Sequence, residues 1–507
     1  MIKLDRQREF FWDDYLVDEA QTTAEYRVHQ PVRRGVAAVF DMPWEGDGCD
    51  YQNILFDPVL NKYRMYYLGW EMLNAEGTLH TITEIHVCLM ESEDGIHWER
   101  PNLGLYEFGG NKDNNIVVHK SQFYDAQYYD TANIDNFFVM IDPNPNPAVP
   151  GRYKAAMAFQ YNQPDGTFRR GLYALVSDDG IHFDVSSIIT EKGRFDTLNV
   201  IQWFPRTGLY HCFIRDFHMP ADENGNIQEI GLREEHKLSV AIRDIRTMTS
   251  PDFIHWTEPK LVNFNDVEDF PLYTNCVSVY PRNTNMLVGF PTRYVERRQW
   301  TSNFDRLCGR EKREGRAKIS PRYGLTVTDC LFMCSRDGEN WFRHDDALMR
   351  PGPEHPMNWV YGDCYPAVGL LDTPSDIAGA ETEMTMYAYE NHWSGQPTFF
   401  VRYTLRWDGF VSRHAGIQPK QVVTKAFTFQ GEQLRINFET SARGYMYIRL
   451  RNTETGEVLS SEEIFGNRVN RIIDFDGSVA AFAGKPVVME IDICDGDIYA
   501  IEFGKFE

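Results

Sequence analysis

The chain has 507 residues, of which 42% are apolar and 25% are charged, and this composition excludes a disordered chain. Its length predicts one large domain with a smaller one beside it. The formal net charge of −23 argues against a nucleic-acid partner and against binding to an anionic membrane, because both attract basic surfaces.

The first twenty residues contain no apolar segment like that of a signal peptide, and no run approaches the roughly 18 apolar residues of a membrane span. The nine cysteines are odd in number and include no Cys-x-x-Cys pair. We therefore expect free thiols, no metal site, no cofactor and a cytoplasmic location.

Four segments share a signature with a central Asp and a terminal aromatic residue. They are Ser92–Trp98 (SEDGIHW), Ser177–Phe183 (SDDGIHF), Ser250–Trp256 (SPDFIHW) and Ser335–Trp341 (SRDGENW), with a looser fifth copy at Arg406–Phe410 (RWDGF). The four aromatic ends are separated by 85, 73 and 85 residues. Asp-Gly favours a tight turn, and the terminal ring can pack on a neighbouring sheet.

Strand-like runs precede every copy of the signature. In chain order they are Asn53–Phe56, Lys62–Leu68 and Ile85–Met90; Asn136–Ile141, Arg152–Phe159 and Leu172–Val176; Asn199–Phe204, Gly208–Ile214 and Ile242–Met248; Cys276–Tyr280, Met286–Phe290 and Leu331–Cys334; and Asp363–Leu371, Glu383–Tyr389 and Phe399–Leu405. Four-stranded units repeated around an axis are the blades of a β-propeller. The alternative is a β-sandwich whose turns coincide by chance.

After the fifth unit the pattern changes to alternating runs separated by turn residues. These runs are Gln433–Phe438, Tyr445–Arg451, Arg471–Phe475, Val487–Ile493 and Asp497–Glu502. They predict a separate β-sandwich over residues 420–507, with a linker at Val411–Lys420. The predicted fold class is therefore all-β: a five-bladed β-propeller over residues 1–415, followed by a C-terminal β-sandwich.

A polar residue opens the first strand of each predicted blade: Asp50, Asp135, Asp196, Asn275 and Asp363. Asp50 and Asp135 each lie 48 residues before the aromatic end of their unit, and Asp196 lies 60 residues before its own. Since first strands line the central channel, we expect three carboxylates to converge. Their repulsion raises at least one pKa, which acid/base chemistry on a glycosidic bond requires. For any one Asp, the alternative is turn capping or solvent contact.

The stretch Asp50–Tyr67 (DYQNILFDPVLNKYRMYY) resembles the first blade of the furanosidase-type propellers of glycoside hydrolase families 32 and 43. Ile134–Asp135 resembles their second-blade motif, and the blade-ending signature and C-terminal sandwich resemble family 32. The resemblance implies that Asp50 is the nucleophile or base and Asp135 the second carboxylate. Those families take their general acid from a Glu of the third blade, where this chain has Asp196. The Asn-Asp-Pro-Asn and Arg-Asp-Pro strings of family 32 are absent, which indicates a distant relative.

Other residues are candidates for acid catalysis or for substrate binding. Glu268 precedes the fourth inner strand and is an alternative general acid. Glu390, His392 and Trp393 lie in the string YENHW, and together with Asn275 and Asp363 they are predicted to bind substrate. The alternative for the acidic loops is a solvated surface.

Residues 293–322 contain ten Lys or Arg in this acidic chain and form an insertion in the fourth unit. One interpretation is a solvated or subunit-contact loop, which leaves a homo-oligomer open. The sharper interpretation places Arg293, Arg297 and Arg298 at the channel rim, where guanidinium groups bind hydroxyls or a carboxylate.

Together these features predict a glycoside hydrolase that acts from the end of a small furanoside-type oligosaccharide, fructosyl or arabinosyl, or a related one. The alternatives are a glycoside phosphorylase or transferase on the same scaffold and a non-catalytic carbohydrate-binding propeller. The fold alone does not separate them.

Overall fold

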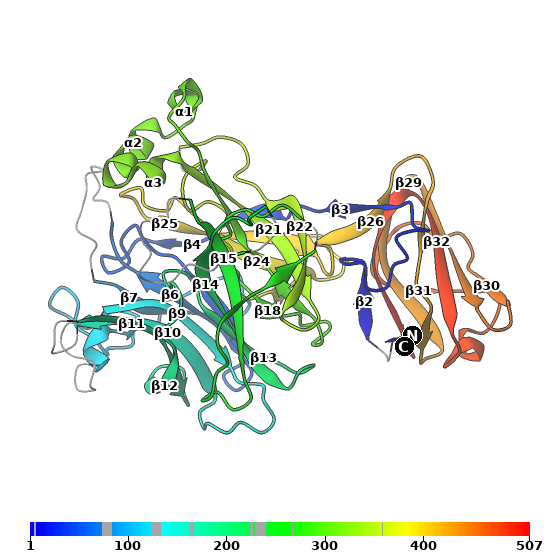
Figure 1. Cartoon of the computed structure of the whole chain (residues 1–507), viewed down its shortest axis with the longest axis horizontal. Helices are drawn as coiled ribbons and strands as arrows, with labels where there is room; N and C mark the ends of the chain where they lie inside the picture. The colour runs from blue at the N-terminus through cyan, green and yellow to red at the C-terminus, as the bar shows by residue number, and fades with distance from the viewer. Residues whose placement is uncertain are drawn as a thin grey trace.

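The computed structural model of the chain describes residues 1–4, 7–72, 84–123, 133–162, 167–223, 227–228, 240–265, 267–356 and 358–506. It has two bodies (Figure 1), and the paired strands β3 (Glu25–Val28) and β26 (Val411–Ala415) run between them. The larger body consists of five small sheets, and the smaller one is a ten-stranded sheet built from both ends of the chain.

The first three sheets of the larger body each have four antiparallel strands in chain order. Blade I holds β5 (Asn53–Asp57), β6 (Lys62–Gly69), β7 (His86–Ser92) and β8 (Ile116–Val118); blade II holds β9 (Asn133–Ile141), β10 (Tyr153–Asn162), β11 (Phe168–Ser177) and β12 (Asp184–Thr190); blade III holds β13 (Val200–Phe204), β14 (Leu209–His218), β15 (Ile242–Ser250) and β16 (Lys260–Leu261). Neighbouring first strands touch in the order β5, β9, β13 and β18, so these strands surround one axis.

Blade IV is the most elaborate sheet. It contains β18 (Ser278–Val279), β19 (Leu287–Gly289), β20 (Thr292–Glu296), β21 (Thr326–Ser335) and β22 (Asn340–Met349), with β17 (Asn263–Phe264) added in parallel at its edge. The Arg-rich insertion between β20 and β21 folds into three short helices, α1 (Ser302–Arg306), α2 (Arg310–Ile319) and α3 (Pro321–Leu325). The sequence predicted a loop here, but the run REKREGRAKI is rich in helix-forming residues.

Blade V takes its outermost strand from the other end of the chain. Its strands are β23 (Leu371–Thr373), β24 (Glu383–Glu390), β25 (Thr398–Arg406) and the N-terminal β4 (Val32–Phe40). β4 pairs antiparallel with β25, so that Ala38 stands opposite Phe400. Val368, just before β23, pairs in parallel with Asn53 of blade I. The ring of five blades is thereby closed, and the predicted five-bladed propeller is confirmed.

The smaller body is a bent sheet that packs against itself. Its two longest strands are β29 (Gln433–Asn452) and β32 (Val487–Gly504), whose pairing shifts register at Asn437/Phe438 and at Thr440/Tyr445. The other strands in it are β1 (Ile2–Leu4), β2 (Arg8–Phe10), β3, β26, β27 (Lys420–Val423), β28 (Phe427–Phe429), β30 (Val458–Ser460) and β31 (Asn467–Ile473). This arrangement agrees with the predicted C-terminal sandwich. The sequence did not indicate that three N-terminal strands join it.

The repeated signature forms the same capped turn in four blades. In blade I, Asp94 accepts hydrogen bonds from the backbone N–H groups of Ile96 and His97, both at 2.8 Å, and Ser92 accepts one from Gly95 at 2.9 Å. Gly95, Gly180 and Gly338 have φ of 73°, 72° and 80°, a conformation that glycine adopts without strain. Phe253 stands at this place in blade III with φ 67°. Its ring is completely buried, which offsets the backbone strain.

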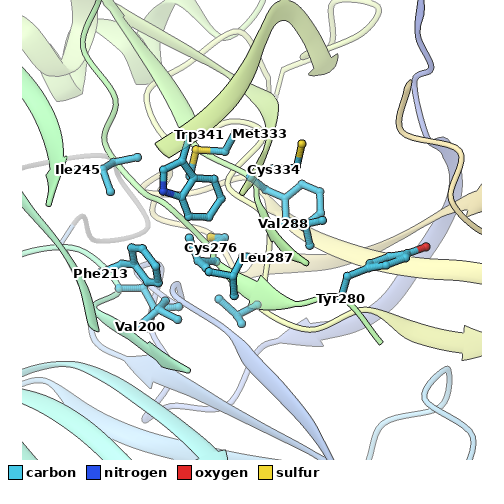
Figure 2. Packing of buried hydrophobic residues seen from close by; sticks show 14 of the residues in the cluster. Val200, Phe213, Ile245, Cys276, Tyr280, Leu287, Val288, Met333, Cys334 and Trp341 are labelled. Carbon is cyan, nitrogen blue, oxygen red and sulfur yellow. The ribbon is translucent and has the colours of Figure 1, made fainter. Parts of the chain in front are cut away.

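The aromatic end of the signature packs on the preceding blade. Trp341 of blade IV meets Phe213 of blade III edge to face, with ring centroids 5.6 Å apart. Figure 2 shows these two side chains with Val200, Ile245 and Met333 in the apolar layer between the two blades. In the same way Phe183 of blade II meets Tyr66 of blade I at 6.3 Å. The signature therefore both joins the last two strands of a blade and seals the blade to its neighbour.

All nine cysteines are free thiols, and eight of them are buried. Among the described residues, no helix has the length and apolar character needed to cross a membrane.

Candidate active site

The backbone kinks in the same way where four of the five inner strands begin. The residues directly after Asp50, Asp135, Asn275 and Asp363 all have φ between 42° and 57°, in the left-handed region. They are Tyr51, Asn136, Cys276 and Cys364. Non-glycine residues adopt this conformation at a cost of about 1–3 kcal/mol, and such strain is common at functional sites. The kink supports the equivalence of Asp50 and Asp135 that the sequence spacing suggested, whereas Thr197, directly after Asp196, does not share it.

Two of the three predicted carboxylates meet at one arginine. Nη2 of Arg170, on β11, lies 3.9 Å from a carboxylate oxygen of Asp135 and 3.9 Å from one of Asp196. Arg215, near the end of β14, donates a hydrogen bond to Asp196. Asp196 opens towards solvent with a side chain that is 45% exposed, whereas that of Asp135 is 18% exposed. Arg170 thus lies between a largely buried carboxylate, Asp135, and a half-exposed one, Asp196.

Asp50 lies deeper in the same place. Its side chain is 3% exposed, and Trp70 donates a hydrogen bond to it from Nε1 at 3.5 Å. Nε2 of His392 is 3.9 Å from its other oxygen. Burial depresses the pKa of His392 well below its ordinary value, so this imidazole is neutral. Asp50 consequently has no cationic partner of its own within ion-pair distance among the residues that the structure describes.

The three carboxylates have different proton affinities. Burial, and then the charge of Asp135, raise the pKa of Asp50 well above its ordinary value. Burial raises the pKa of Asp135 to about 7, against the opposing charge of Arg170 and with the charge of Asp196 adding to the rise. For Asp196 burial also acts upward, but Arg215 and Arg170 together outweigh it and lower the pKa to about 2. At neutral pH the site therefore holds an ionised Asp196 beside a pair that retains a proton.

Aromatic side chains wall this site. Trp393 stacks on Tyr361 with centroids 4.8 Å apart and meets Trp70 edge to face at 5.7 Å. Tyr323, from α3 of the Arg-rich insertion, packs on Trp393 at 5.0 Å. Such rings stack on the apolar faces of sugars. Nε1 of Trp393 and the hydroxyl of Tyr389 are buried without a hydrogen-bond partner, and a bound ligand or water would satisfy them.

The loop that carries His392 and Trp393 is held by the insertion. Arg316, on α2, is fully buried and donates hydrogen bonds to the backbone oxygens of both residues. Gly362 packs against the His392 ring so closely that a Cβ there would lie 2.7 Å from Cδ2 of the imidazole. The two predicted residues of the YENHW string that reach the site are therefore His392 and Trp393.

The third member of that string is engaged elsewhere. Glu390 forms a two-point ion pair with Arg33 of β4, with both distances 2.9 Å, and accepts a hydrogen bond from Tyr403 at 2.9 Å. It therefore fastens the closing strand of blade V. Asp363 accepts a hydrogen bond from the N–H of Val360 at 2.8 Å and so caps a turn.

Two further predicted residues, Asn275 and Arg293, are held by other parts of the protein. Asn275 is buried, and its amide bonds the backbone oxygens of Leu198 and Phe213, both at 3.4 Å. Arg293 forms a two-point ion pair with Asp329. It lines a groove beside the channel that also includes Glu268, whose side chain is exposed.

Arg170 and Arg215, two cations that lie beside Asp196, were not predicted from the sequence. Arg215 belongs to the string FIRDFH, where a charged pair interrupts a buried strand. An arginine inside a buried strand needs a carboxylate or another acceptor beside it, so the string FIRDFH itself indicated an ion pair at this position. Among the described residues, no group of three or more His, Cys, Asp or Glu side chains is arranged to hold a metal ion.

No protein-family model and no curated protein sequence matches the chain. Among solved structures it is similar to an N-acetylgalactosamine deacetylase from F. plautii, in complex with blood group B trisaccharide, with 12% identity over 76% of this chain and 95% of that one, and a TM-score of 0.40. It is similar to a thermostable family-43 glycoside hydrolase, with 11% identity over 72% and 92% and a TM-score of 0.38.

A third similar structure is the GH32 beta-fructofuranosidase BmSUC1 of Bombyx mori, with 9% identity over 96% of this chain and 97% of that one, and a TM-score of 0.39. The chain is thus a distant structural match to five-bladed propeller glycoside hydrolases, as the sequence resemblance predicted. At these identities the likeness concerns the fold alone.

Proposed function

We propose that the protein is a glycoside hydrolase that cleaves a small furanoside-type oligosaccharide, fructosyl or arabinosyl, or a related one. The proposal rests on the geometry of three aspartates: Arg170 lies 3.9 Å from both Asp135 and Asp196, and Asp50 is buried beside Trp70 and His392. Their different surroundings separate their proton affinities. Hydrolysis of a glycosidic bond needs one carboxyl group that gives a proton and one that stays ionised.

Asp135 fits the role of proton donor, because a pKa of about 7 keeps a useful fraction protonated near neutral pH. Its proton goes to the glycosidic oxygen as the bond to the anomeric carbon breaks. Asp196, ionised and accessible, takes the proton of the attacking water or forms the bond to the anomeric carbon itself. Asp50 keeps its proton and donates a hydrogen bond to the sugar.

This assignment differs from the one that the family resemblance implies, where Asp50 is the nucleophile or base. The physical reason is the neighbourhood: two arginines hold Asp196 ionised, whereas burial beside Trp70 and the neutral His392 keeps Asp50 protonated. The depth of Asp50 also favours action on the terminal sugar of a chain, since a side chain with 3% exposure is reached only by a chain end. We further propose a cytoplasmic location, which suits the nine free thiols.

The test is a panel of aryl furanosides and pyranosides with fructans and arabinans, and NMR to read the stereochemistry of the product. Asp135→Asn should lower kcat by about 10²- to 10⁴-fold with the fold intact. Asp376→Asn, at a side chain that is 67% exposed, is the matched control and should retain full turnover. Unchanged turnover in Asp135→Asn would exclude the proposed role of this residue.

Two comparisons separate the remaining alternatives. Asp196→Asn should be at least as damaging as Asp50→Asn if Asp196 is the ionised partner, and the reverse order would restore the family assignment. Binding of glycans without turnover by the unaltered protein would indicate a carbohydrate-binding propeller instead of an enzyme. Turnover that requires phosphate would indicate a phosphorylase.

A further inference from the structure

A second hollow lies beside the channel, between blade III and the insertion of blade IV. It has a volume of about 1000 Å³, and its lining includes Arg243 of β15, Tyr294 of β20, and Arg297, Arg298 and Arg322 of the insertion. We call it the arginine groove. None of the residues proposed above for bond cleavage lines it.

The charges in the arginine groove are only partly paired. Arg293 is neutralised by Asp329, and Asp345 is paired with Arg343 at 2.9 Å. The other acids in the lining are Glu268 and Glu296, both exposed. Against these two stand four arginines, at positions 243, 297, 298 and 322, without a carboxylate in ion-pair distance among the described residues. A cationic excess is notable in a chain of net charge −23.

The buried wall of the groove has unused hydrogen-bonding groups. Arg243 is 9% exposed, its guanidinium lies 4.0 Å from the ring centroid of Tyr294, and its Nε has no hydrogen-bond partner. The Tyr294 hydroxyl, on a residue that is 2% exposed, is also unpartnered. A buried donor without a partner costs about 1–3 kcal/mol, and an oxyanion would accept from both groups.

One aromatic layer separates the groove from the carboxylates. Arg243 and Arg215 lie over the same ring of Phe217, at 5.4 and 4.9 Å. Tyr294 packs on Tyr273 at 5.8 Å, and the Tyr273 hydroxyl donates to the backbone oxygen of Asp196 at 2.8 Å. The arginine groove and the carboxylates therefore lie on the two sides of a single aromatic layer, a distance that neighbouring sugars of one oligosaccharide can span.

We propose that the arginine groove binds the oxyanion of an acidic sugar, a carboxylate, sulfate or phosphate group, carried by the substrate or by the sugar next to the cleaved bond. The sugar part of this statement rests on the proposed function, whereas the anion part does not. Guanidinium groups bind all three anions through paired N–H donors, so the chemistry that they share is what the groove recognises.

Binding is tested first, without any turnover. Galacturonate, inorganic sulfate and inorganic phosphate are titrated calorimetrically into the full chain at constant ionic strength. The exposed pair Arg297→Gln/Arg298→Gln should weaken binding of at least one anion by about tenfold or more, and Arg243→Gln likewise. The control Arg451→Gln removes a 45% exposed arginine of the C-terminal sheet and should leave binding unchanged.

The double variant alters only exposed side chains, so the test survives if Arg243→Gln fails to fold. Anion binding that is absent, or that falls equally in the control, would overturn the proposal. The order of affinities among the three probes identifies which oxyanion the groove prefers.

Activity then connects the groove to the channel. On matched aryl glycosides with and without an acidic group, the double variant should lose about tenfold in kcat/KM on the acidic one and keep the neutral one. Equal loss on both would overturn the subsite. If phosphate were instead consumed and appeared on the released sugar, the anion would be a co-substrate and the assignment to an acidic sugar would be wrong. Failure of the hydrolase proposal leaves the binding result standing, so the two failures are distinguishable.

Discussion

Arg215 donates a hydrogen bond to Asp196 from a side chain that is 4% exposed, whereas the acceptor is 45% exposed. A buried, permanent cation therefore lies directly beneath an accessible carboxylate. Arg215 is itself positioned by Tyr273 and Phe217, whose ring centroids are both 4.9 Å from the guanidinium. The arrangement fixes the charge of Asp196 without closing it off from a ligand.

Arg215→Gln should raise the pKa of Asp196 from about 2 towards its ordinary value, because the nearer of its two cations is removed. The acidic limb of the pH profile of kcat/KM should then move to higher pH by about one unit. Arg215→Lys retains the charge and should move it less. A limb that stays in place in the Gln variant would show that Asp196 does not govern it.

Asp135→Asn should stabilise the folded protein, relative to the unaltered chain, more at high pH than at low pH. A folded-state pKa of about 7 lies above that of the unfolded chain, so the native state binds the extra proton and loses stability as pH rises from about 4 to 7. The whole effect is about 4 kcal/mol at most. Melting temperatures at pH 4 and pH 8 measure it: the gain of the variant over the unaltered protein should be larger at pH 8. Equal differences at both values would contradict the raised pKa.

Gly180→Ala should be far more damaging than Gly104→Ala. Both glycines have a left-handed φ, 72° and 65°, so both variants carry the backbone cost of about 1–2 kcal/mol. A Cβ on Gly180 would also lie 2.6–2.7 Å from atoms of Arg64, Tyr66 and Tyr153, at the contact of blades I and II. A Cβ on Gly104 meets no atom within 4 Å. Chemical denaturation should show about 1–3 kcal/mol of additional loss for Gly180→Ala, and similar losses for both would show that this contact yields easily.

Asp408→Ala tests the joint between the two bodies of the chain. Asp408 is fully buried and pairs with Arg8 of β2 at 2.6 Å, and Tyr280 of blade IV donates to it at 2.7 Å. Without it the buried Arg8 keeps its charge and loses its nearest partner, which costs about 3–5 kcal/mol. Asp376→Asn is the exposed control. Denaturation curves that coincide for Asp408→Ala and the unaltered protein would rule out this role.

The propeller could be predicted because its information is local. Each signature forms its turn from its own residues, such as Ser177, Asp179 and Gly180, and so is visible as a short string. The spacing from Trp98 and Phe183 then located Asp50 and Asp135 at kinked strand starts. The strands of the first three blades follow one another in the chain, whereas the fifth blade takes one strand, β4, from the N-terminal region.

The rest depends on contacts between distant parts of the chain. Ala38 of β4 pairs with Phe400 of β25, and no feature of the string VRRGVAAVF indicates which strand it pairs with. Arg170 was missed for the same reason, since its carboxylates come from two other strand ends. Glu390 was predicted at the site because it lies two residues before His392, but it is the last residue of β24 and pairs with Arg33 of β4.

Because β4 pairs with β25, blade V cannot be completed until late in the synthesis of the chain. The strand is made among the first forty residues, whereas its partner β25 ends at Arg406. At the usual 5–20 residues per second, roughly 20–70 s pass between the two. During that interval β4 has left the ribosome but lacks its partner strand, and the backbone of an unpaired strand can form hydrogen bonds with other chains. The strand VRRGVAAVF carries two positive charges and a glycine near its start, and these limit pairing with other chains until β25 has been made.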